Sequence, residues 1–284
     1  MRVLVNGVHL FFDVDGPRLV PDGDTMRSRP TLLLVHGGPG YDHSGFKPDF
    51  GRLTNVAQVV YLDLRGNGRS DRASPATWNL SQWAADLHGF CGALEIERPI
   101  VLGASFGGEV AMRFAVDYPE QPAGVILMSV TARLRLDRSL AVFERLGGVA
   151  ARDAAARYWQ AATPETHAEY LKVCVPLYST RAEHTAAVRR RAIMYEDVAV
   201  HYNSGEARSV NLLPELRHIR CNTLLIAGSD DPITTIEDAE DIAQALPGGH
   251  SRLFRLEGHR HLPYRDDPER VLGAIEAFVR EVSV

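Results

Sequence analysis

Short apolar runs, each rich in Val, Ile and Leu, recur along the chain at residues 31–35, 59–63, 100–103, 125–129, 223–227 and 253–256. Their apolar residues are continuous and do not alternate with polar ones. This pattern is typical of strands buried on both faces of a parallel sheet, because every side chain then meets a covering layer. We therefore predict buried parallel strands at these positions.

Helix-length segments separate the runs at residues 80–94, 106–118, 236–246 and 268–282. Pro119 and Pro247 stop two of these segments, and Pro268 stands in the first turn of the last one. The last segment gathers its apolar residues on one stripe, as a helix that covers a core does. The alternation of strands and helices predicts an α/β fold with a mostly parallel central sheet flanked by helices.

The alternation breaks between residues 131 and 215, where no strand-like run occurs. Ala, Arg and Leu dominate this segment, and aromatic residues punctuate it. An insertion that leaves after one strand and returns before the next lies above the carboxyl edge of the sheet, where open α/β folds bind ligands. We therefore predict a core of residues 1–130 and 216–284 and a helical lid, or cap, of residues 131–215.

The amino-terminal thirty residues predict a hairpin followed by a loop. Residues 2–5 and 10–14 flank Asn6-Gly7, a dipeptide that favours the two-residue turn between antiparallel strands. A polar stretch that contains Pro and Asp follows, up to Pro30.

Composition and charge exclude several classes of protein. Hydrophobic residues make up 45% of the 284 residues and charged residues 24%, which excludes a disordered or low-complexity chain. The formal net charge of −5 offers no polycationic surface to nucleic acid. No apolar run has the length of a membrane helix, and the amino terminus does not resemble a signal peptide. We expect a cytoplasmic protein that binds neither nucleic acid nor a membrane.

Cys91, Cys174 and Cys221 are odd in number and widely spaced. This spacing predicts neither a disulfide framework nor a structural zinc site, so we interpret them as reduced thiols in or near the core. We expect no metal and no cofactor. No feature of the sequence specifies an oligomeric state.

Ser105 is the candidate nucleophile, because it stands between a predicted strand and a predicted helix. The sequence Gly-Ala-Ser-Phe-Gly at residues 103–107 has the G-x-S-x-G spacing of a nucleophile elbow. Such a tight turn strains the backbone of the serine, and the two glycines leave space for neighbouring chain. The hydroxyl then lies at the amino end of a helix, where unpaired N–H groups favour an oxyanion.

A second glycine-rich bend, His-Gly-Gly-Pro-Gly at residues 36–40, follows the run at 31–35. It can turn backbone N–H groups toward a reacting carbonyl without obstruction by side chains. We predict an oxyanion hole formed by the amides of Gly38 and Phe106. A phosphate-binding loop is excluded because no Lys-Ser or Lys-Thr follows the glycines.

These motifs resemble those of the α/β-hydrolases and, among them, the proline iminopeptidases. The resemblance rests on the bend at 36–40, on the Ser105 elbow and on Asp-Leu-Arg-Gly-Asn-Gly-Arg-Ser at residues 63–70, and it covers nearly the whole chain. It implies an α/β-hydrolase fold with an inserted helical lid. It is less specific for the substrate, since esterases, lactonases and epoxide hydrolases are similar as well.

The family's order of Ser, Asp and His implies two further catalytic residues downstream. The family places its Asp three residues after a glycine and before a proline, which favours Asp231 and leaves the adjacent Asp230 as the alternative. The spacing to the proline that opens the last helix favours His261, with His259, which follows a glycine, as the alternative. The imidazole would take the serine proton, and the carboxylate would hold the imidazole's tautomer.

The resemblance to proline iminopeptidases also implies acidic lid residues that hold the free amino terminus of the substrate. Glu196 and Asp197, beside Tyr195, are the candidate pair, because carboxylates and aromatic faces both attract cations. We interpret Arg189-Arg190-Arg191 as solvated surface, and Asp63, Arg65 and Ser70 as residues that pack a loop.

The sequence therefore predicts a serine hydrolase that works through an acyl-enzyme, and specifically an aminopeptidase that releases an N-terminal proline or another small apolar residue. A carboxylesterase or lactonase acting on small acyl esters is the alternative enzyme. A non-catalytic ligand-binding protein on the same scaffold is the alternative from another class.

Overall fold

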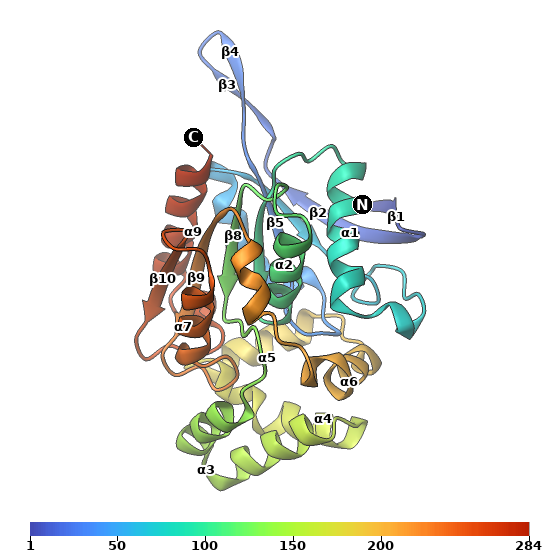
Figure 1. The fold of residues 1–284 in the computed structure, drawn as a ribbon, viewed down its shortest axis with the longest axis vertical. Coiled ribbons are helices and arrows are strands. Elements are labelled where there is room, and N and C mark those ends of the chain that lie inside the picture. Colours follow the sequence, from blue (N-terminus) through green and yellow to red (C-terminus); the bar gives the residue numbers. More distant parts are fainter. Residues whose placement is uncertain (284) are drawn as a thin grey trace.

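An eight-stranded sheet forms the centre of the molecule, which we describe from a computed structural model (Figure 1). The structure describes residues 1–283, and of residues 182 and 188 only the backbone. The strand order is β1-β2-β6-β5-β7-β8-β9-β10, in which β5 to β10 run parallel and β2 is antiparallel to both of its neighbours, β1 and β6. The predicted mostly parallel sheet is thus confirmed.

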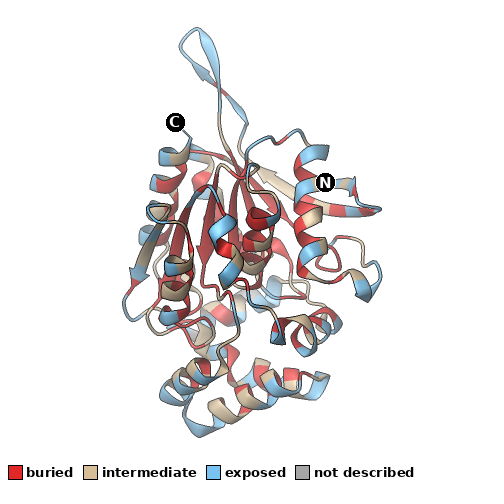
Figure 2. Cartoon of the chain, in the orientation of Figure 1, coloured by how far each residue is buried: buried red, intermediate tan, exposed pale blue. Residues whose placement is uncertain are grey.

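The six predicted strands are all present. Their bounds are β5 (Thr31–Val35), β6 (Gln58–Leu62), β7 (Ile100–Ala104), β8 (Gly124–Met128), β9 (Asn222–Gly228) and β10 (Ser251–Leu256). Figure 2 shows the central strands buried, as their continuous apolar runs predict. Strand β10 is different: it lies at the sheet edge, and only Leu256 of its residues is buried.

Helices cover both faces of the sheet, which explains why the apolar runs do not alternate. In β5, Leu33 and Val35 belong to one buried cluster and Leu32 and Leu34 to the other. The first cluster is completed by α1 (Leu80–Ala93), α2 (Phe106–Asp117) and α7 (Ile236–Ala245), and the second by α9 (Pro268–Val282), which follows the short α8 (Pro263–Asp266). No helix within residues 1–283 is both long and apolar enough to span a bilayer.

The amino-terminal hairpin forms as predicted, and a second hairpin follows it. Strands β1 (Arg2–Val5) and β2 (Val8–Asp15) join at Asn6 and Gly7, whose positive φ angles of 47° and 78° fit the two-residue turn. The stretch that we expected to be a loop instead contains β3 (Leu19–Asp22) and β4 (Thr25–Ser28). This second hairpin projects from the body and is almost wholly exposed, so no apolar alternation marks it in the sequence (Figures 1 and 2).

Between β8 and β9 the chain forms a helical segment over the carboxyl edge of the sheet (Figure 1). It contains α3 (Leu136–Gln160), α4 (Pro164–Val173), α5 (Ala182–Arg191) and α6 (Glu196–Ser204). Its two ends lie side by side, because Leu212 N donates to Ala132 O at 2.9 Å. It has a small apolar cluster of its own around Phe143 and Tyr170. Its helical nature matches the expectation, and its treatment as a separate lid stays a prediction.

A buried ion pair ties α1 to the loop after β6. Arg65 donates from Nε and Nη2 to the two carboxylate oxygens of Asp86 at 2.7 and 2.8 Å, and both side chains are buried. Asn6 and Gln82 also donate to Asp86, at 2.9 and 3.0 Å. The carboxylate therefore joins the first hairpin, the loop and the helix, in line with the packing role expected for Arg65.

We predict that Asp86→Ala lowers the free energy of unfolding by about 3–5 kcal/mol, because the Arg65 guanidinium would remain buried without its partner. Urea denaturation followed by circular dichroism measures this change. Glu281→Ala, which removes the exposed pair with Arg252, is the matched control and should leave the denaturation midpoint nearly unchanged. Equal midpoints for the two variants would contradict the role assigned to Asp86.

Candidate active site

Ser105 sits at a strained turn between β7 and α2. Its backbone has φ 52° and ψ −124°, a conformation that non-glycine residues rarely adopt. A Cβ on Gly103 would lie 2.3 Å from Gly107 O, and a Cβ on Gly107 would lie 2.3 Å from Val35 O. Because backbone is packed against backbone at both places, only glycine fits there. The G-x-S-x-G pattern is thus a steric requirement of this turn.

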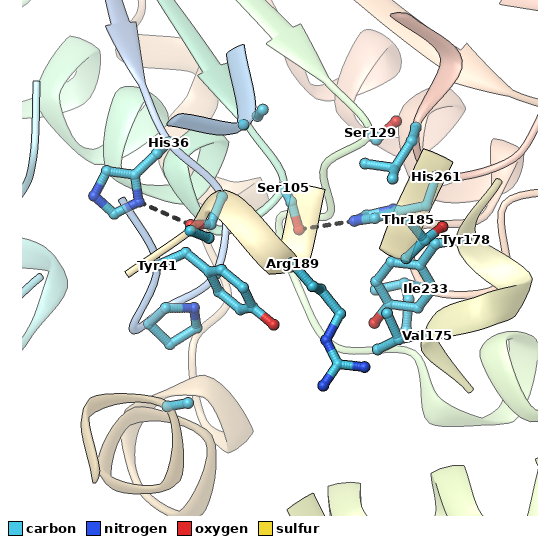
Figure 3. Close-up of a pocket in the computed structure, with 18 of the residues that line it drawn as sticks. His36, Tyr41, Ser105, Ser129, Val175, Tyr178, Thr185, Arg189, Ile233 and His261 are labelled. Carbon is cyan, nitrogen blue, oxygen red and sulfur yellow. Dashed lines mark hydrogen bonds between the residues drawn. The ribbon is translucent and has the colours of Figure 1, made fainter. Parts of the chain in front are cut away.

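Hydrogen bonds connect Ser105, His261 and Asp231 in sequence. His261 Nε2 lies 3.0 Å from Ser105 Oγ (Figure 3). His261 Nδ1 lies 2.8 Å from Asp231 Oδ2. Asp231 accepts further bonds from the amide of Ile233 at 2.8 Å and from the Thr234 hydroxyl at 2.7 Å. The fully buried carboxylate therefore favours the tautomer with the proton on Nδ1, which leaves Nε2 free to accept the serine proton.

The two alternatives from the sequence lie elsewhere. Asp230 pairs with Arg145 on α3, with 3.1 Å between Nη2 and Oδ1. His259 places its Nδ1 2.9 Å from Glu257 O, and its Nε2 3.8 Å from Asp267. Neither residue bonds to Ser105 in the described part of the chain. The structure thus brings Asp231 and His261, and not their neighbours, to the serine.

The bend at residues 36–40 passes directly beside Ser105. A Cβ on Gly37 would lie 3.4 Å from Ser105 Cβ, so this glycine, too, permits a close approach. His36 positions the bend: its Nε2 accepts from the Leu64 amide at 3.2 Å, and its Nδ1 lies 2.8 Å from Gly37 O. Burial lowers the pKa of His36, in keeping with a neutral imidazole that accepts at one nitrogen and donates at the other.

The amides of Gly38 and Phe106 are available to a ligand. Phe106 is the first residue of α2, so its N–H has no partner within the helix. Gly38 has φ 136°, a conformation open to glycine, and lines the same cavity as Ser105. Neither amide donates a hydrogen bond within residues 1–283. Both amides are therefore without a partner in the described chain, and their role as an oxyanion hole stays a prediction.

The loop at residues 63–70 is held by its own contacts. Asp63 accepts from the His43 and Arg69 amides, each at 2.9 Å, and its carbonyl accepts from the Ser70 hydroxyl at 2.6 Å. These contacts agree with the structural interpretation of Asp63 and Ser70.

Ser105 and His261 open into a cavity of about 190 Å³ that the core and the helical segment line together. Its lining includes the aromatic side chains of Tyr41, Phe46, Tyr158, Trp159, Tyr170, Tyr178 and Tyr264. Asp42 is its one carboxylate among the described residues, and this group already binds Arg69 and the Ser44 hydroxyl at 2.8 and 2.6 Å. The cavity therefore offers apolar surface and no uncompensated negative charge.

The three lid residues proposed for substrate binding are absent from the described lining of this cavity. Tyr195 stacks on the Arg72 guanidinium, 3.9 Å from its ring centroid, and Asp197 forms an ion pair with the same Arg72. Glu196 lies 3.1 Å from Nδ1 of the buried His167. The structure thus does not bring these side chains to Ser105.

Arg189 was missed by the sequence analysis, which placed it on solvated surface. It comes from α5 and lines the cavity, whereas Arg190 and Arg191 do not (Figure 3). Thr185, four residues earlier on α5, lines the cavity as well, and this helical spacing is the one signal that could have indicated a common face. Within residues 1–283 no cluster of three His, Cys, Asp or Glu side chains could hold a metal ion.

Comparisons with known proteins agree on the fold and differ on the substrate. Residues 30–268 match the model of the alpha/beta hydrolase fold family. The chain is 28% identical to "Putative carbamate hydrolase RutD" of Escherichia coli O7:K1 in an alignment 246 positions long that covers 81% of this chain and 84% of that protein.

Two solved structures illustrate the range of similar proteins. A thermophilic esterase from Thermogutta terrifontis, with malate bound, is 26% identical, with a TM-score of 0.75 and 100% of both chains covered. A proline iminopeptidase from Mycobacterium smegmatis is 21% identical, with a TM-score of 0.78 and 99% of this chain and 98% of that chain covered. The proline iminopeptidases are therefore one of several groups with this architecture.

We predict that Ser105→Ala, His261→Ala and Asp231→Asn each lower kcat by at least about 10³-fold, because each breaks the hydrogen-bonded chain. Steady-state hydrolysis of p-nitrophenyl acetate measures the loss. His259→Ala and Asp230→Asn are matched controls on the same two loops and should keep the activity of the unsubstituted protein. A loss in His259→Ala with full activity in His261→Ala would reverse the assignment.

Proposed function

The chain belongs to the alpha/beta hydrolase fold family and is a hydrolase of that type, and from this premise we propose that it is a serine carboxylesterase that acts on small acyl esters. The observation that carries the proposal is the hydrogen-bonded chain from Ser105 through His261 to the buried Asp231. A serine hydroxyl is protonated at neutral pH, so it needs an adjacent base to attack a carbonyl carbon. His261 is this base, and its hydrogen bond to Asp231 favours the tautomer whose Nε2 can accept the serine proton.

In the first half of the proposed cycle, Ser105 Oγ attacks the ester carbonyl while His261 Nε2 takes its proton. The negative charge that develops on the carbonyl oxygen is stabilised by the amides of Gly38 and Phe106, together with the amino end of α2. The imidazolium is stabilised by Asp231 and then gives its proton to the departing alcohol. An acyl group remains on Ser105.

In the second half, a water molecule attacks the acyl carbon and His261 accepts its proton. The same two amides hold the second oxyanion, and its collapse returns the proton to Ser105 Oγ and releases the carboxylic acid. No other group in the cavity is required for either proton transfer. The hydrogen-bonded chain argues against the non-catalytic alternative, since a binding protein has no need of an activated serine.

Charge in the cavity favours an ester over a peptide with a free amino terminus. An aminopeptidase has to stabilise an ammonium group, and a carboxylate without another partner does this best. The oxygens of Asp42 already bind Arg69 and Ser44, while Arg189 adds a positive charge to the lining. The similarity to a thermophilic esterase supports the same choice.

We also propose that the protein is located in the cytoplasm, which is a reducing compartment. The three cysteines are free and buried, which is common in proteins of reducing compartments. Burial raises the pKa of Cys91 to about 12, so this thiol stays protonated and unreactive.

The proposed function is tested by comparing p-nitrophenyl butyrate with proline p-nitroanilide. We expect Ser105-dependent release of p-nitrophenol from the ester, with kcat/KM above that for the anilide by at least about 10²-fold, since an ammonium group would meet the Arg189 charge. Ser105→Ala provides the background rate. Efficient release of nitroaniline, with little ester hydrolysis, would overturn the proposal in favour of the aminopeptidase.

A further inference from the structure

We propose that the natural substrate is an ester that carries a carboxylate, and that Arg189 and Thr185 of α5 bind this carboxylate in the cavity. The inference rests on the proposed function, because it adds a substrate class to the same site. It concerns selectivity and leaves the chemistry at Ser105 unchanged.

Arg189 presents a cation to the cavity without an anionic partner. In Figure 3 its side chain extends from α5 between Tyr41 and Val175, and the guanidinium group is directed away from the Ser105–His261 pair. Its one hydrogen bond to the rest of the described chain runs from Nη1 to Leu171 O at 3.1 Å. No carboxylate of residues 1–283 lies within 4.0 Å of it. Most of the donors of this group are therefore left for a ligand or solvent.

Thr185 adds a buried hydroxyl that has no partner. Only 5% of this residue is exposed, and its Oγ1 makes no hydrogen bond within the described residues. Because Thr185 and Arg189 are four residues apart on α5, their side chains lie on the same helix face, and both line the cavity. A buried hydroxyl without a partner is unfavourable, so a bound oxygen atom would satisfy it.

The charges around Arg189 leave its positive charge uncompensated. Burial lowers the pKa of the neighbouring His167, an effect that Arg189 adds to and that the hydrogen bond with Glu196 opposes. Burial raises the pKa of Tyr41, and the nearby Arg189 only partly counteracts this. Both neighbours are thus neutral near pH 7, and Asp42 already binds Arg69.

A carboxylate fits this arrangement better than a neutral polar group. The planar guanidinium can donate two parallel hydrogen bonds to the two oxygens of a carboxylate. A hydroxyl donor one helical turn away adds a third bond.

The test compares two esters with the same five-carbon acyl chain, monoethyl glutarate and ethyl pentanoate. We expect Arg189→Gln to lower the ratio of kcat/KM for the glutarate ester to that for the pentanoate ester by about 10- to 100-fold, mainly through KM. Thr185→Val should lower the same ratio less. Arg190→Gln, the adjacent arginine outside the cavity, is the matched control and should keep the ratio of the unsubstituted protein.

A third ester distinguishes where the carboxylate resides. In the pentanoyl ester of glycolate the carboxylate belongs to the alcohol part, whereas in monoethyl glutarate it belongs to the acyl part. The inference is supported if Arg189→Gln lowers kcat/KM for either charged ester relative to ethyl pentanoate. The ester that is affected shows whether the carboxylate belongs to the acyl or to the alcohol part of the substrate. Ratios that Arg189→Gln leaves unchanged for both charged esters would overturn it.

A binding measurement separates this inference from the proposed function. Glutarate should slow the labelling of Ser105 by a fluorophosphonate in the unsubstituted protein and in Arg190→Gln, and much less in Arg189→Gln. If this pattern occurs while no ester is hydrolysed, the carboxylate site stands and the esterase proposal fails. If esters are hydrolysed but glutarate never slows labelling and the ratios do not change, the esterase stands and the carboxylate site is refuted.

Discussion

The strained turn at Ser105 is the constraint on which the rest of the site depends. Ser105 has a positive φ angle where α2 packs closely against β7 at Gly103 and against the end of β5 at Gly107. His261 and Asp231 then reach the serine because the parallel strands β9 and β10 end at the same edge of the sheet as β7. A shift of the turn would separate all three.

The buried carboxylates of the core and the exposed arginine of the cavity differ in how their charges are paired. Asp86, Asp63 and Asp231 are all buried, and each accepts several hydrogen bonds from fixed donors, so each is held as a rigid part of the scaffold. Arg189 has no such partner on its cavity side. Because Arg189 is exposed, its charge is hydrated, and most of its donors remain available to an anion. The contrast favours a role for Arg189 in recognition.

Much of the core could be predicted from the sequence, and the reasons are local. Continuous apolar runs, helix-stopping prolines and glycine spacings act within a few residues, so the strands, the flanking helices and the Ser105 turn all follow from them. The β3–β4 hairpin was missed because exposed strands carry no apolar signal. Asp231 and His261 could be chosen only from the motif spacing of the family. The contact between their two loops joins distant parts of the chain, so neither loop carries a local sequence signal for it.

The helical segment was harder to interpret because its contacts join residues far apart in the chain. The carboxylate of Asp197 looked available in the sequence, yet it meets Arg72, which lies 125 residues earlier. Arg189, within a run of three arginines, looked like surface, yet the packing of α5 against the loop after β5 turns it toward the cavity.

The core and the helical segment contribute differently to the site. The strand ends of the core position Ser105, His261 and Asp231, while the core and the helices between β8 and β9 together line the cavity. Since α5 contributes none of the hydrogen bonds that orient His261, its cavity-facing residues can change without disturbing the Ser105 turn. Substrate selectivity can therefore change while the catalytic scaffold stays the same. This explains why proteins with this architecture are named for such different substrates.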